Sequence, residues 1–146
     1  MKFRTFAFLT FLFAVHGVAA TAESGEMTPM QAIFAAAEHT EGVSGIFTFE
    51  VKGSGRGDGR LYLNSEPDYR DQRCLTVSIA SPVETELRSQ LGGDPAVVLK
   101  GKRIRVDGRA QRVTIWFFIK GVKTDFYYYQ TQIDLLSAAS LVYHQK

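Results

Sequence analysis

The side chains best suited to hold a metal or a polar ligand lie together in one acidic turn. Glu66, Asp68 and Asp71 fall within this turn, and Arg70 lies among them. Carboxylate oxygens are the ligands that Ca²⁺ prefers, so the three acids are candidates for a calcium site. The alternative, which we favour, is a turn whose carboxylates bond their own backbone while Arg70 makes a local ion pair. We therefore expect no metal and no cofactor.

The residues that commonly carry catalysis are few and scattered. His39 and His144 lie near opposite ends of the chain, without a partner at the spacing of a zinc or catalytic motif. Cys74 is the single cysteine and opens an alternating run, so we expect a packed strand residue rather than a reactive thiol. The glycines of segment 53–59 precede a strand rather than the helix that a phosphate cradle requires, so we expect a mobile loop. No catalytic residue is predicted, and binding is favoured over catalysis.

A candidate ligand-binding surface lies in the second half of the chain. Over residues 99–108 the alternation places Arg103 and Arg105 opposite the core-facing Ile104 and Val106. The next strand, expected as the hairpin partner of this one, combines basic and aromatic side chains on one face. Positive charge beside flat rings suits single-stranded nucleic acid, sugars or an aromatic protein surface. The candidate ligand-binding residues are Arg103, Arg105, Arg112, Trp116, Phe118, Tyr62 and Arg70.

Two segments of this half are apolar on both faces. They are residues 116–119 and residues 126–129, and a glycine at position 121 separates them. A strand with two apolar faces is either covered on both sides or part of an interface. The pair therefore raises the possibility of self-association through exposed strands.

The N-terminus has the three-part layout of a secretory signal peptide. Lys2 and Arg4 precede an apolar run from Phe6 to Val15, and the small residues of segment 18–22 follow. We expect residues 1–22 to be a signal peptide, cleaved after Ala20 or Ala22, and the protein to be periplasmic or secreted. The apolar run is too short for a membrane span, so we expect no transmembrane segment in the mature chain.

Removal of the signal peptide changes the charge of the protein. The chain has 17 Lys and Arg against 15 Asp and Glu, and the loss of Lys2 and Arg4 leaves 15 of each. A net charge of zero gives no general attraction for nucleic acid, so such binding would depend on a local patch.

The order of the expected elements indicates the fold. Thr28 and Gln31 form a capping box that starts a short helix. Its apolar side is expected to contain Met30, Ile33, Phe34 and Ala37. The expected elements after it are a hairpin (46–52 and 60–64), a strand (75–79), a helix (82–91, with Ser81 as N-cap), the strands 99–108, 111–119 and 125–133, and a short strand at 140–143. This predicts one domain, residues 23–146. Its fold would be mainly β: a five- to six-stranded OB-like Greek-key barrel with a helix between strands 3 and 4 and a short N-terminal helix.

Several short segments also carry a resemblance. They are Tyr62-Leu63-Asn64-Ser65-Glu66, Asp68-Tyr69-Arg70-Asp71, Leu75-Thr76-Val77, Gly101-Lys102-Arg103-Ile104-Arg105-Val106 and Gln130-Thr131-Gln132-Ile133. In these segments the chain resembles a group of small exported bacterial proteins of OB-like type. The resemblance implies a fold and an exported location, and it implies no particular activity.

Three functions follow from these observations. The first is an exported, non-enzymatic binding or interaction module whose partner is an oligosaccharide, a protein or a single-stranded nucleic acid. The second is a nuclease-like hydrolase on the same barrel, although the expected cluster of catalytic residues is absent from the sequence. The third is a self-associating structural or stress protein of the cell envelope.

The signal peptide is directly testable. We expect the intact mass of the protein recovered from the periplasm or medium to correspond to a chain that starts at Thr21 or Glu23. Recovery of a chain that retains Met1 to Ala20 would contradict the expectation.

Overall fold

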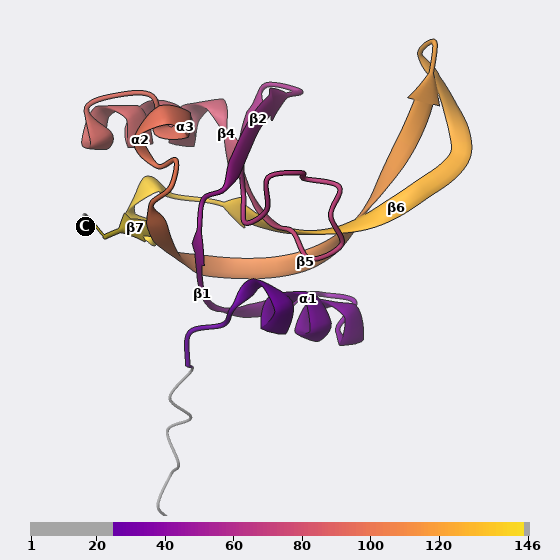
Figure 1. The fold of residues 1–146 in the computed structure, drawn as a ribbon, viewed down its shortest axis with the longest axis horizontal. Coiled ribbons are helices and arrows are strands. Elements are labelled where there is room, and N and C mark those ends of the chain that lie inside the picture. The colour runs from indigo at the N-terminus through magenta and orange to yellow at the C-terminus, as the bar shows by residue number, and fades with distance from the viewer. Residues whose placement is uncertain (1–24, 145–146) are drawn as a thin grey trace, which may run out of the picture.

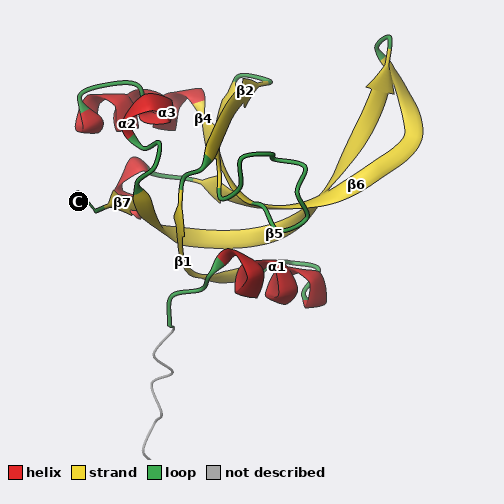
Figure 2. Ribbon diagram, in the orientation of Figure 1, coloured by secondary structure: helices red, strands yellow, loops and turns green. Residues whose placement is uncertain are grey.

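A computed structural model describes residues 25–144, so the expected signal peptide lies outside the described part of the chain. In this part, seven strands form one open mixed sheet, accompanied by three α-helices (Figures 1 and 2). None of these helices combines the length and hydropathy that a bilayer crossing requires. The elements are α1 (Pro29–Glu38), β1 (Val43–Glu50), β2 (Gly53–Gly57), β3 (Arg60–Asn64), β4 (Leu75–Ala80), α2 (Ser81–Leu91), α3 (Pro95–Val98), β5 (Arg103–Ile119), β6 (Val122–Leu135), a 3-10 turn (Ala138–Ser140) and β7 (Leu141–Tyr143).

The strand order in the sheet is β1-β5-β6-β4-β3-β2, and β7 also pairs with β5. The β4–β6 pair is parallel, and the other pairs are antiparallel. The two ends of the order, β1 and β2, are consecutive in the chain and are separated only by Val51 and Lys52. The prediction of a mainly β fold is confirmed. The sheet remains open, with seven strands rather than five or six.

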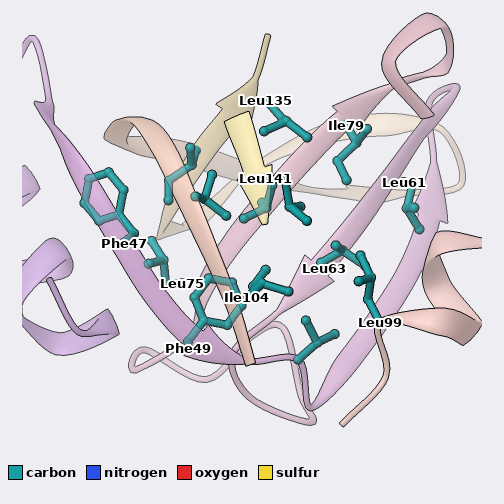
Figure 3. Packing of buried hydrophobic residues seen from close by; sticks show 14 of the residues in the cluster. Phe47, Phe49, Leu61, Leu63, Leu75, Ile79, Leu99, Ile104, Leu135 and Leu141 are labelled. Carbon is teal, nitrogen blue, oxygen red and sulfur yellow. The ribbon is translucent and has the colours of Figure 1, made fainter. Parts of the chain in front are cut away.

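The core is formed by one face of this sheet, because alternate residues of each strand point to the same side. The register places Phe47 opposite Val106 and Phe49 opposite Ile104, so β1 and β5 contribute adjacent apolar side chains. Leucines and isoleucines from β3, β4 and β6 complete the cluster (Figure 3). Their close packing supplies the main favourable free energy of folding in a domain whose single cysteine, Cys74, is free and buried.

Three expectations about the strands are wrong. The expected hairpin of residues 46–52 with 60–64 does not form, because β1 pairs with β5 while β3 pairs with β2 and β4. Residues 103–119 form one continuous strand, β5, whereas we expected a hairpin between residues 99–108 and 111–119. The glycine-rich segment expected as a loop is strand β2, which pairs with β3 through a two-residue turn at Asp58 and Gly59. Both φ values in this turn are positive, as in the turns that match the twist of a tight hairpin.

The helix starts were predicted with mixed success. The capping box of Thr28 and Gln31 is confirmed, but α2 begins at Ser81 with Ala80 as its N-cap. The Ser81 hydroxyl instead donates a hydrogen bond to the Gly59 carbonyl at 2.8 Å.

The expected apolar side of the first helix is also wrong. Ala32 and Ala36 are the buried residues of α1, whereas Met30 and Phe34 are exposed. Residues four apart lie on one helix face, and their small side chains let α1 approach the strands closely. Through this face α1 contacts β1, β4, β5 and β6.

We expect Ile104→Ala to lower the free energy of unfolding by about 2–5 kcal/mol, because Ile104 is fully buried in the core. Urea denaturation followed by circular dichroism measures the change. The matched control is Leu136→Ala, since the Leu136 side chain is 82% exposed. Equal losses in the two variants would contradict this description of the core.

Candidate ligand-binding groove

A groove crosses the face of the sheet that points away from the core. Tyr62 and Asn64 from β3, Thr76 from β4, and Gln130 and Gln132 from β6 all lie on this face, as the strand register requires. The groove has a volume of about 360 Å³. We call it the outer groove; it is lined by Ser54, Gly55, Arg56, Asp58, Tyr62, Asn64, Pro67, Tyr69, Thr76, Ile115, Tyr128, Gln130 and Gln132.

The floor of the outer groove is polar and internally hydrogen-bonded. The Thr76 hydroxyl donates to Asn64 Oδ1 at 2.9 Å, and both residues are almost fully buried. Gln132 Nε2 donates to Gln130 Oε1 at 2.7 Å. A primary amide offers two donor hydrogens and an oxygen with two lone pairs, so these bonds use only part of its capacity. The floor is therefore uncharged, and the half-buried Gln132 amide is the member of it that is most accessible to a ligand.

Tyrosines form the aromatic part of the groove wall. Tyr62 stands on β3, Tyr128 on β6, and Tyr69 on the loop between β3 and β4. Gln130 Nε2 holds this loop by donating to the Tyr69 carbonyl at 2.8 Å. Burial raises the pKa of Tyr128, and the nearby phenol of Tyr69 raises it further. Because this shift is upward, Tyr128 remains a neutral hydrogen-bonding group at physiological pH.

The acidic turn is part of the same loop, and each of its carboxylates faces its own cation. Glu66 accepts from Lys52 at 3.1 Å. Asp68 pairs with Arg70 at 3.1 Å, and Asp71 pairs with Arg73 at 2.8 Å. Within residues 25–144, no group of three or more His, Cys, Asp or Glu side chains is arranged to hold a metal ion. Each of the three carboxylates of the turn is thus held in an ion pair.

At the other end of the groove, ion pairs connect β2 to the helices. Arg56 donates to Glu84 at 2.5 Å and to Asp94 at 2.8 Å. The hydrogen bond that Arg56 donates to the Glu84 carboxylate is the main cause that raises the pKa of Arg56. Arg88 also donates to Glu84, at 3.1 Å. The charge of Arg56 is thus largely balanced within the protein.

The structure does not bring the predicted ligand-binding residues together. Tyr62 lines the outer groove, and Arg70 lies on its loop, with the guanidinium 5.7 Å from the centre of the Tyr69 ring. Arg103 and Arg105 lie on the same sheet face at the far end of β5, where Arg105 pairs with Glu26 at 2.9 Å.

Arg112 and Trp116 lie on the opposite face of β5 from Arg103 and Arg105. This follows from the continuous strand, since residues an even number apart share a face and those an odd number apart do not. Arg112 stacks over the Tyr129 ring at 4.5 Å. Trp116 and Phe118 are exposed on the distal part of β5. The single basic and aromatic surface expected from the sequence is therefore split in two.

Sequence reasoning missed most of the groove. Asn64, Thr76, Gln130 and Gln132 were not among the candidates, although the last two lie in an alternating polar run at the end of an aromatic strand. That polar run was the available signal. Polar side chains that lie buried on a sheet face indicate the lining of a groove rather than a solvent-exposed surface.

No protein-family model matches the chain, and comparison with curated proteins gave no significant match.

The pairing of Asp71 with Arg73 predicts an unusual titration. Hydrogen bonds from the Arg73 side chain and backbone lower the pKa of Asp71 from its ordinary 3.8 to about 2. A lowered pKa in the folded state means that the pair stabilises the fold above about pH 4 and that this contribution is lost as the pH falls toward 2. Carboxyl ¹³C shifts measured by NMR should show the low midpoint, and Arg73→Gln should move it up toward the ordinary value. A midpoint unchanged by that substitution would contradict the assigned cause.

Proposed function

We propose that this protein is an exported, OB-like binding module that holds a neutral oligosaccharide in the outer groove. The observation that carries the proposal is the chemistry of the groove, which combines amide and hydroxyl groups with three tyrosine rings. Sugars present hydroxyl groups at their edges and C–H groups on their faces, so hydrogen-bonding side chains beside aromatic rings suit them.

The strand arrangement supports the OB-like part of the proposal. If β1 and β2 are taken as two halves of one bent strand, that strand pairs with β5 at one end and with β3 at the other. The parallel β4–β6 pair and the position of α2 after β4 are in keeping with a five-stranded Greek-key barrel. In such barrels oligosaccharides and oligonucleotides bind across the strands, between flanking loops.

The charges favour a sugar over a nucleic acid. A strand of phosphates requires several cations along the groove. Among the described residues that line it, Arg56 and Asp58 are the charged ones, and Arg56 already donates to two carboxylates. The net charge of zero expected for the mature chain also favours a neutral sugar over a nucleic acid.

Binding is tested by NMR titration with neutral oligosaccharides of the cello-, chito-, malto- and xylo- series. We expect one of them to shift the side-chain amide signals of Asn64, Gln130 and Gln132. Loss of one hydrogen bond costs about 0.5–1.5 kcal/mol, so Gln132→Ala should weaken binding roughly 3- to 10-fold. Tyr62→Ala should weaken it about tenfold through lost stacking.

The chain offers matched controls for both variants. Gln111 lies directly opposite Gln132 in the β5–β6 register but outside the groove lining, so Gln111→Ala should leave the affinity unchanged. Tyr127→Ala removes an exposed tyrosine outside the groove. The proposal fails if no sugar shifts the groove amides, or if single-stranded oligothymidylate binds there more tightly than every sugar.

A further inference from the structure

Beyond the sheet, β5 and β6 continue alone as a two-stranded arm, which we define as residues 112–129 (Figure 1). β1 pairs with β5 no further than Ala110, and β4 pairs with β6 only from Thr131 onward. At about 3.3 Å per residue, the eight residues from Arg112 to Ile119 extend the arm roughly 26 Å. Lys120 (φ 50°) and Gly121 (φ 79°) close it in a tight two-residue turn.

The tip of the arm is apolar and exposed on both faces. Phe118 and Ile119 are each 63% exposed, and Val122 is 69% exposed. Phe118 and Ile119 are consecutive in a strand, so their side chains point to opposite faces. A partner that docks on one face of the ribbon would leave the other face in water. An environment that surrounds the tip, as the outer part of a lipid layer does, buries both faces at once.

The arm also carries side chains of the kinds that suit a membrane interface. Lys120 and Lys123 lie at the apolar tip, where they can meet anionic headgroups. Behind them, the Trp116 and Tyr127 rings are 5.0 Å apart and Lys123 Nζ lies 3.6 Å from the Trp116 ring centre. Tryptophan and tyrosine are enriched at headgroup level, because one end of each ring system is apolar and the other polar.

The arm also carries net positive charge. Residues 112–129 contain three basic side chains, Arg112, Lys120 and Lys123, and one acidic side chain, Asp125. The free edges of both strands limit how deep the arm can go, since unpaired backbone groups must keep hydrogen bonds to water or headgroups. A depth of about 5–10 Å corresponds to two or three residues on each side of the turn. On the β5 side these are the apolar residues 117–119, and on the β6 side Val122 is followed by Lys123 and Thr124.

We propose that the arm inserts its tip, formed by Phe118, Ile119 and Val122, into the headgroup region of an anionic lipid layer. The insertion holds the domain at a membrane surface. This goes beyond ligand binding in the outer groove and does not depend on it, because the tip residues take no part in the groove. A second copy of the chain is the competing occupant, since the free strand edges could pair with one another.

The test uses the chain from Glu23 onward, which retains every described helix and strand. It is mixed with vesicles of phosphatidylcholine, either pure or containing about 30% phosphatidylglycerol. We expect co-sedimentation with the anionic vesicles and a blue shift in the emission of Trp116, the single tryptophan. Each lysine near the surface contributes about fivefold, so Lys120→Gln with Lys123→Gln should weaken binding roughly 25-fold.

Two control variants distinguish specific insertion of the arm from non-specific hydrophobic or electrostatic adsorption to the vesicles. Phe118→Ser with Ile119→Ser and Val122→Ser should abolish vesicle binding, whereas Val97→Ser with Leu136→Ser, at equally exposed apolar sites, should not. Arg103→Gln with Arg109→Gln removes two exposed charges away from the arm and should leave binding within about twofold of the parent. Unchanged thermal unfolding shows that the tip variant is folded.

Three results would overturn the proposal. The first is the absence of binding to anionic vesicles. The second is an equal loss of binding in the tip variant and in its control. The third is a concentration-dependent dimer in sedimentation that the tip substitutions dissolve while vesicle binding is unaffected, which would assign the arm to a second copy.

Discussion

The pairing of β5 on both of its edges is the constraint on which the rest of the structure depends. β1 holds one edge, and β7 and β6 hold the other in succession. Gly108 makes this crowding possible, because a Cβ atom there would lie 2.8 Å from Ile133 Cγ2. The strand then continues to Ile119, with a register irregularity against β6 between Trp116 and Phe118. It therefore contributes to the core, to the groove through Ile115, and to the arm.

Local patterns predicted those elements whose causes are local. The capping box at Thr28 and the alternation in β3 and β4 each involve neighbours in the sequence, and the structure has them. Gly108 and Gly53 were misjudged, because glycine serves both in turns and where packed segments approach closely. A Cβ atom would lie 2.8 Å from Ile133 Cγ2 at Gly108 and 2.8 Å from the Glu66 carbonyl oxygen at Gly53. The two roles are distinguished only by residues that are far from these glycines in the sequence and close to them in space.

The groove was harder to predict than the fold because its residues have no common spacing. Asn64 bonds Thr76 across two strands, and Gln130 bonds the backbone of Tyr69, 61 positions earlier in the chain. From the sequence alone a polar side chain is expected to be exposed to solvent. The strand register is needed to show which side chains lie next to it. The continuous strand also places Arg112 and Arg105 on opposite faces of the sheet. The expected hairpin of residues 99–108 and 111–119 would have placed them on one surface.

The order of the strands also bears on how the chain reaches this structure. The β2–β3 and β5–β6 pairs are joined by two-residue turns. By contrast, the β1–β5 pair joins segments that are far apart in the sequence, with Val43 opposite Ala110. Closing a long loop costs more chain entropy than closing a hairpin, so the local hairpins form before the distant pair. The ribbon of β5 and β6 is therefore expected to exist while the core is still open. During that interval its unpaired edges can pair with strands of other chains, and docking of β1 then covers the β5 edge as far as Ala110.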